Sequence, residues 1–206
     1  MTGSLALIEV GGWSPGMVIL DAMEKAGGIE ILQAELNDQP GVCLKLGGPL
    51  ADIRAAAAAA EAIAERMQTR IIADVIPGPA PGSEKAWEAA PDFNPLMEQA
   101  TVQLPRKKMP NDRDLQSPFA VGLIETQGFT AVFEATDTAL KAAAVEVLAR
   151  EKLGGGYITV VIKGDVAAVN AAVEAGKAKV EGLGRLIAAH VIPNPSPGVL
   201  ALLPKA

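Results

Sequence analysis

Three consecutive glycines, Gly154, Gly155 and Gly156, form the stretch whose composition most directly suggests chemistry. They stand in "EKLGGGYITVVIKG", between charged residues and an apolar run. Glycine-rich loops bind phosphate when they lead from a strand into a helix, because the free N–H groups of the helix then face the anion. Here the glycines lead into a β-branched run that predicts a strand, and no Lys-Ser/Thr pair follows. This order disfavours a phosphate site and favours a loop that approaches another surface closely.

Side chains suited to catalysis are sparse. The single histidine, His190, lies in an apolar segment without a cysteine or carboxylate motif nearby, so we expect a core histidine rather than a base or metal ligand. The single cysteine, Cys43, excludes an intrachain disulfide and lies in the predicted strand "VCLKL", where a small buried thiol is ordinary. We therefore predict no enzyme, no metal site and no cofactor.

The composition indicates a protein that associates with copies of itself. Of the 206 residues, 50% are hydrophobic but only 3% are aromatic, so the interior must be aliphatic. No apolar run approaches the ~18 to 20 residues that cross a bilayer, and the surplus of apolar residues therefore favours subunit interfaces over membrane contact. The N-terminus lacks the pattern of a signal peptide, which predicts a cytoplasmic protein.

The charge balance argues against a nucleic-acid partner. The formal net charge is −6, whereas nucleic-acid binding normally depends on clustered Lys and Arg. The one basic cluster, "PRKKMP" at 105–110, is typical of a solvated linker.

The sequence repeats itself at a constant offset of 116 residues. "LALIEVGGW" from Leu5 aligns without a gap on "VGLIETQGF" from Val121, and the same offset holds at "VIPGP" and "VIPNP". Because one register persists over the whole unit, the chain contains two copies of one module. Equivalent pairs include Leu7 with Leu123, Glu9 with Glu125, Lys25 with Lys141, Gly48 with Gly164 and Pro77 with Pro193.

Each copy predicts the order βαββαβ, which gives an α+β fold with helices on one face of a mainly antiparallel four-stranded sheet. Pro49 and Asp165 stand where the Ala-rich second helix of each copy begins. We predict a first domain at 1–82, a connector at 83–118 that begins with a short helix in "SEKAWEAA", and a second domain at 119–206. Glu9 and Glu125 are interpreted as fold or interface residues, and Trp13 and Phe129 as packing residues.

Several of these segments, in this order, resemble the bacterial microcompartment shell domain. They are "AVGLIETQGFTAVFEATDTALKAAAVEV", "EKLGGGYITVVIKGDVAAVNAAVEAG" and "HVIPNP", and residues 5–82 match the same pattern more loosely. The chain thus resembles the tandem-domain members of that family, which implies two ferredoxin-like shell domains per chain and trimers that imitate a hexamer. The partners implied are a homotrimer, other shell proteins of the same compartment, and small metabolites that cross a central pore.

The resemblance also implies which residues line the pore. The loop between the second and third strands of each copy points at the axis of the disc, where glycine permits close approach and positive φ. These residues are Leu153, Gly154, Gly155 and Gly156 in the second copy, and Asn37, Asp38, Gln39 and Pro40 in the first.

Two interpretations of Asp38 stay open. A ring of Asp38 carboxylates would favour cationic or neutral polar metabolites over anions, whereas a turn-stabilising role in "NDQPG" would leave charge preference unaffected. Some tandem shell proteins hold an iron–sulfur cluster through cysteines in this loop, and this sequence has none there.

The edge of the disc is implied by two further pairs of positions. Lys25 and Lys141 match the edge lysine of the family, while Gly78 and Asn194 replace the arginine of "VIPRP", which suggests altered contacts between tiles. The predicted function is a structural shell tile with a metabolite pore, located in the shell of a bacterial microcompartment. The alternative is a regulatory protein of duplicated α+β domains that binds a small metabolite.

Overall fold

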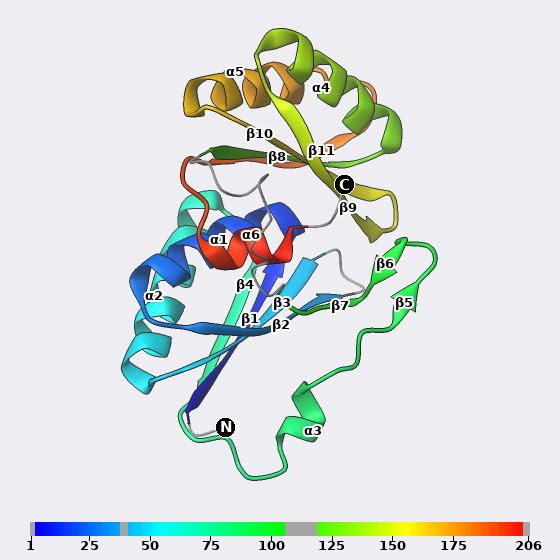
Figure 1. The fold of residues 1–206 in the computed structure, drawn as a ribbon. Helices are drawn as coiled ribbons and strands as arrows, with labels where there is room; N and C mark the ends of the chain where they lie inside the picture. The colour runs from blue at the N-terminus through cyan, green and yellow to red at the C-terminus, as the bar shows by residue number, and fades with distance from the viewer. Residues whose placement is uncertain (1–2, 38–40, 106–118, 204–206) are drawn as a thin grey trace, which may run out of the picture.

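The computed structural model describes residues 3–37, 41–105 and 119–203 of the chain (Figure 1). It contains two modules of the same construction. The first module comprises β1 (Ser4–Gly11), α1 (Trp13–Ala26), β2 (Glu30–Asn37), β3 (Gly41–Gly48), α2 (Leu50–Met67) and β4 (Ile71–Ile76). The second module comprises β8 (Ala120–Gln127), α4 (Phe129–Ala142), β9 (Glu146–Gly154), β10 (Tyr157–Gly164), α5 (Val166–Lys177) and β11 (Arg185–Ile192).

Both modules have the same antiparallel sheet. The strand orders are β4-β1-β3-β2 and β11-β8-β10-β9, and in each sheet the two helices cover one face. Alternate residues of each strand point to opposite faces, so Ala6, Ile8 and Val10 of β1 enter the core beneath the helices. The predicted α+β fold of two βαββαβ modules is confirmed.

The helices begin and end where the sequence permits. Pro49 precedes α2, and Gln68 ends it in the left-handed region with φ 53°. The Asp165 side chain accepts a hydrogen bond from the N–H of Ala168 at 2.9 Å and so caps α5. Among the described residues, none of the helices has the length and apolar character that a membrane crossing requires.

The connector and the C-terminal segment add short elements. The predicted connector helix is present as α3 (Glu84–Trp87). It is followed by three strands of two residues each, β5 (Phe93–Asn94), β6 (Gln99–Ala100) and β7 (Val102–Gln103), and β7 extends the first sheet beside β2. A last helix, α6 (Pro197–Leu202), follows β11 and lies against α1 (Figure 1).

The two modules share a continuous apolar interior. The second sheet has α4 and α5 on one face, and α1 and α6 on the other (Figure 1). Trp13 and Met17 of α1 have no exposed surface and belong to the same apolar cluster as Val121, Leu123 and Ile192 of the second module. The first module therefore presents a helix to the sheet of the second module, as the packing role predicted for Trp13 requires.

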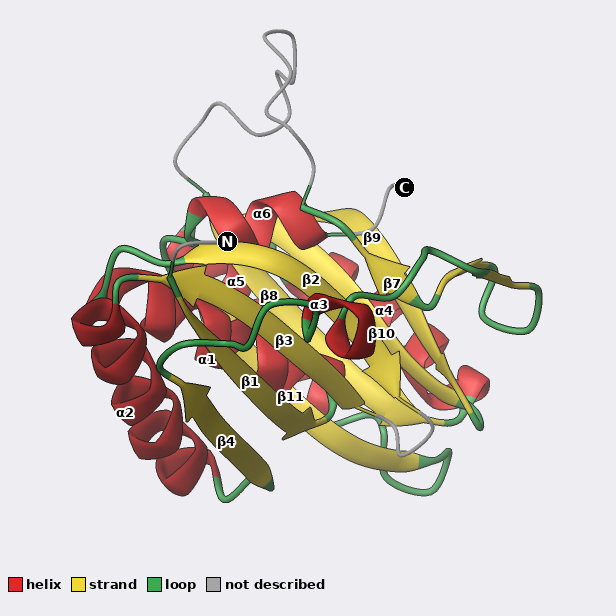
Figure 2. Cartoon of the chain, turned by 90° about the horizontal axis from the view of Figure 1, so that it is seen from below, coloured by secondary structure: helices red, strands yellow, loops and turns green. Residues whose placement is uncertain are grey.

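Among residues 3–37, 41–105 and 119–203, the opposite face of the first sheet has no second layer of comparable extent. Figure 2 views this face, with α3 and the connector crossing part of it. The connector is held there by Gln33, whose Nε2 donates to the carbonyl of Ala89 at 2.9 Å, and by Lys45, whose Nζ donates to the carbonyl of Trp87. The β1 and β4 side of this face, which includes Glu9 and Asp74, is exposed.

Candidate functional site

The glycine loop is a tight β-hairpin turn between β9 and β10. Gly154 pairs with Tyr157, so Gly155 and Gly156 form the two-residue turn. The φ angles of Gly154, Gly155 and Gly156 are 82°, 59° and 82°, all in the left-handed region that only glycine adopts without strain. A Cβ on Gly154 would meet nothing within 4 Å in this chain, so backbone conformation alone accounts for that glycine here.

The loop is attached to the end of β8 and the start of α4. The N–H of Gly128 donates to the carbonyl of Gly156 at 2.9 Å, and the Nε2 of Gln127 donates to the carbonyl of Gly155 at 3.4 Å. Leu153 is 5% exposed and packs in the apolar cluster between the modules. The accessible part of the loop is therefore its three glycines.

The equivalent hairpin of the first module joins β2 to β3. Asn37 ends β2 and pairs with Gly41, the first residue of β3. The other residues predicted to line the pore from this module, Asp38, Gln39 and Pro40, lie outside the described residues. Their pore role, like that of the glycine loop, stays a prediction.

Two of the predicted edge residues meet within the chain. Lys25 Nζ donates to the Asp21 carboxylate at 2.6 Å and to the backbone carbonyl of Asn194 at 2.8 Å, across the boundary between the modules. The equivalent pair is not in contact. Lys141 forms an ion pair with Asp137 and keeps 74% of its side chain exposed, while Gly78 has nothing within 4 Å of its Cβ position.

Glu125 is a buried carboxylate at the boundary between the modules. Its Oε1 and Oε2 accept hydrogen bonds from the N–H groups of Trp13, at 3.3 Å, and Ser14, at 2.8 Å. The N-cap residue of α1 is Gly12, which supplies no side-chain hydrogen bond, so a side chain of the other module satisfies these free helix donors. Burial raises the pKa of Glu125 to about 7, although both hydrogen bonds act to lower it. Glu125, which we interpreted as a fold or interface residue, thus joins the two modules within one chain.

Glu125 belongs to a row of buried polar residues across the second sheet. Thr159 of β10 pairs with Glu125 on one side and Glu151 of β9 on the other, and all three have no exposed surface. Glu151 accepts hydrogen bonds from Gln99 and Gln103 of the connector. Burial, with the nearby Glu125 charge adding to it, raises the pKa of Glu151 to about 8.

Glu151 and Thr159 were not predicted as functional residues from the sequence. The available signal was the repeat, because Glu151 is equivalent to Glu35 just as Glu125 is equivalent to Glu9. Glu9, Cys43 and Glu35 form the same cross-strand row on the first sheet.

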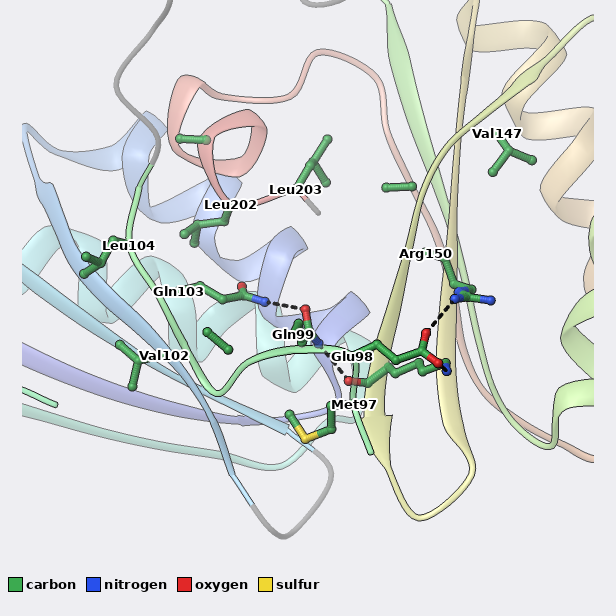
Figure 3. A pocket seen from close by; sticks show the side chains of 14 residues that line it. Met97, Glu98, Gln99, Val102, Gln103, Leu104, Val147, Arg150, Leu202 and Leu203 are labelled. Carbon is green, nitrogen blue, oxygen red and sulfur yellow. Dashed lines mark hydrogen bonds and ion pairs between the residues drawn. The ribbon is translucent and has the colours of Figure 1, made fainter. Parts of the chain in front are cut away.

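A cavity of about 680 Å³ opens between the connector, β9 and the C-terminal helix (Figure 3). Within it Glu98 pairs with Arg150 at 3.1 Å and with Lys152 at 2.7 Å, and Gln99 donates to the carbonyl of Lys152. Its walls come largely from segments outside the repeat, and the three loop glycines do not line it. The cavity is therefore separate from the predicted pore loop.

The two residues considered for catalysis or metal binding lie in partly buried strands. Burial lowers the pKa of His190. Burial raises the pKa of the Cys43 thiol to about 11, with Lys45 acting in the opposite direction, so this thiol is protonated at neutral pH. Within the described parts of the chain, no three His, Cys, Asp or Glu side chains gather as a metal site would require.

Comparisons with known proteins agree on one family. The BMC domain model matches residues 4–79 and again residues 120–195. The bacterial microcompartment shell protein PduA of Citrobacter freundii is 46% identical over 86 residues, which cover 42% of this chain and 92% of that protein. The major carboxysome shell protein CsoS1A of Halothiobacillus neapolitanus is 47% identical over 88 residues, which cover 42% of this chain and 90% of that protein.

A crystal structure of a microcompartments protein from Desulfitobacterium hafniense matches with 25% identity and a TM-score of 0.38, and the match covers 95% of this chain and 97% of that one.

Proposed function

Since the chain belongs to the bacterial microcompartment shell protein family and carries two BMC domains, we propose that three copies form a pseudohexameric disc that tiles a compartment shell. The observation that carries this proposal is the double match, at residues 4–79 and 120–195, within one chain. The relatives matched are shell proteins, and each is covered almost completely by one domain's length of this chain. The proposed domain division is a first domain at 1–82, a connector at 83–118 and a second domain at 119–206.

The packing within the chain supports a ring. The helix α1 of the first module packs against the face of the second sheet that α4 and α5 do not cover, so the two surfaces in contact differ from each other. Contacts between unlike faces continue from unit to unit and generate a ring when the rotation closes. Three chains supply six modules for such a ring.

The pore is proposed to lie where the hairpin loops meet the axis. The positive φ angles of Gly154 to Gly156 support a loop whose tip carries no side chains. Three such loops would alternate with three loops carrying Asn37, Asp38, Gln39 and Pro40. An Asp38 ring would favour cationic or neutral polar metabolites, because a full carboxylate charge outweighs the partial charge of an amide.

The shell location and the contact with other shell proteins are part of the same proposal. Lys141 and Gly78, which the chain leaves accessible, are the proposed edge residues for a neighbouring molecule. Lys25 and Asn194 are proposed to act at the edge beside their contact with each other.

Assembly is tested by sedimentation of the full chain and by electron microscopy at low salt. We expect a trimer and extended sheets or tubes. A monomer that melts at a higher temperature with a saturating small metabolite, and forms no sheets, would instead support the regulatory alternative. The observation that favours this alternative is the cavity beside β9, which could hold a small metabolite.

The pore is tested by the permeation of charged solutes through shells made with wild-type protein or with Asp38→Asn. We expect the variant to admit more anions. An unchanged charge preference would discard the Asp38 ring and leave the tile proposal intact.

A further inference from the structure

The cavity beside β9 is formed largely by segments that the repeat does not contain. Its volume of about 680 Å³ lies in the range of pockets that hold small organic molecules. One wall is the connector from Met97 to Leu104, a second is β9, and a third is the end of α6 (Figure 3). The BMC domain matches cover 4–79 and 120–195, so two of these three walls come from outside the shared domains.

Most of the cavity lining is apolar. Val102, Leu202 and Leu203 are almost fully buried and belong to packed parts of the chain, so this part of the lining is firmly held. Leu104 and Val147 are 51% and 44% exposed, so another part of the apolar lining is in contact with water. A ligand with an apolar body would remove this surface from water, which is favourable.

The polar part of the lining carries an excess of positive charge. Arg150 and Lys152 of β9 both pair with the carboxylate of Glu98, so two cations share one anion. The neighbouring Glu151 has its pKa raised to about 8 by burial, so at neutral pH it is largely protonated and leaves this excess in place. The cavity therefore favours a ligand with a negative charge.

Arg150 is the cation best placed to bind that charge. Lys152 holds Glu98 at 2.7 Å, whereas Arg150 reaches it through one guanidinium nitrogen at 3.1 Å (Figure 3). The hydrogen bond from Lys152 is also the main cause that lowers the pKa of Glu98. Because a guanidinium has five N–H donors in a planar fork, Arg150 has the donors to bind a second carboxylate while Lys152 keeps Glu98.

We propose that this cavity binds a small amphipathic carboxylate, whose charged end accepts hydrogen bonds from Arg150 and whose apolar end covers Leu104 and Leu202. Glu98 is a competitor within the chain, because its carboxylate takes one nitrogen of Arg150 and repels the ligand's charge. This binding site goes beyond the proposed tile and does not depend on it.

The probe is octanoate, titrated into the full-length chain by isothermal titration calorimetry. We expect saturable binding of one octanoate per chain. Acetate lacks the apolar body and octanamide lacks the charge, so each should bind at least ~10-fold more weakly. Octanoate that shows no saturable binding, or octanamide that binds as tightly as octanoate, would overturn the proposal.

Two variants test the assigned residues. Arg150→Gln should weaken octanoate binding at least ~10-fold and leave octanamide binding unchanged, whereas Glu98→Gln should strengthen octanoate binding severalfold. Arg54→Gln removes the same charge from an exposed position on α2 and is the matched control. Circular dichroism shows whether each variant is folded. Equal octanoate affinity in wild type and Arg150→Gln would overturn the role of Arg150, and unchanged or weaker binding by Glu98→Gln would overturn the competition.

Sedimentation of the same samples separates this inference from the proposed tile. A trimer that binds no octanoate would overturn the inference and leave the tile standing. A monomer that binds octanoate through Arg150 would support the inference and overturn the tile.

Discussion

At the scale of single residues, the clearest comparison is between two glutamates that the repeat makes equivalent. Glu125 is fully buried and accepts two backbone N–H groups, while Glu9 is exposed and has no such partner in the described chain. The local sequences around them, "LIEV" and "LIET", are nearly the same. Their environments therefore differ because of what packs on each sheet, and the titration of Glu125 reports on that packing.

The stability of the chain should fall as pH rises through the range in which Glu125 ionises. Its folded pKa is about 7, above the ordinary 4.5, so the folded chain binds this proton more strongly than the unfolded chain does. The contribution is fully present below about pH 4.5 and lost by about pH 7. Glu125→Gln cannot ionise, so between these pH values it should gain on wild type by up to about 3 kcal/mol in free energy of unfolding.

Urea unfolding at several pH values measures this difference. Glu151, with its pKa raised to about 8, leaves a residual pH dependence in both proteins. Glu65→Gln on the exposed side of α2 is the control. Parallel pH profiles for wild type and Glu125→Gln would show that folding does not raise the pKa of Glu125.

A second residue-scale prediction concerns the glycine turn. Gly154→Ala adds a methyl group in open space but at a φ of 82°, and should lower the free energy of unfolding by about 1 kcal/mol. Gly78→Ala also adds a methyl group in open space, without the left-handed φ, and should have little effect. Urea titrations at one protein concentration compare them, and equal losses would contradict the conformational explanation.

At the scale of elements, α6 shows how tertiary contacts create a helix of six residues. The Glu24 carboxylate of α1 accepts hydrogen bonds from the N–H of Gly198, at 2.9 and 3.1 Å, and from the Ser196 hydroxyl. A Cβ at Gly198 would lie 2.2 Å from Ile31 Cδ1, so the helix start is pressed against the first module. Side chains of α6, including Val199 and Leu202, complete the shared core.

Glu24→Ala should release α6 without unfolding the modules. The variant loses the acceptor for the first amide groups of the helix, at a cost of about 1 to 2 kcal/mol. Hydrogen exchange should become faster at Gly198 and Leu200 and stay unchanged in β1. Glu61→Ala on α2 serves as the control. Faster exchange throughout the second sheet would mean that Glu24 holds the modules together rather than α6 alone.

The repeat and its hydrophobic periodicity were sufficient to predict the large elements. The positive φ of Gly154 to Gly156 was also predictable, because three glycines before a β-branched run suit a tight turn. The strands β5 to β7 were not, since two residues are too few for a periodic pattern and their pairing depends on neighbouring edges. Helix α6 was missed because its prolines indicated only the end of a strand, and the partner of Glu125 was missed because packing between modules leaves no local pattern.

At the scale of the whole molecule, substitutions of the equivalent residues Leu7 and Leu123 should distinguish folding of the chain from its assembly. Leu123 is fully buried between the modules, whereas Leu7 lies partly exposed on the open sheet face, next to Lys45 and Asp74. Leu123→Asp should unfold the chain, because it buries a charge in the shared core. Leu7→Asp should leave the monomer folded and prevent the trimer.

Circular dichroism measures folding of these two variants, and sedimentation measures assembly. A folded Leu123→Asp monomer would contradict the packing between the modules. An intact trimer for Leu7→Asp would show that the open face of the first sheet is not an interface.

The placement of α1 beneath the second sheet of its own chain determines which units a shell can gain or lose. A contact inside one polypeptide keeps its strength at any abundance, whereas a contact between polypeptides weakens on dilution. A ring of three such chains would dissociate only at the boundaries between chains, which are every second boundary between modules. It would therefore release two modules at a time. Repair of such a surface would replace one chain, and thus two modules, in each exchange.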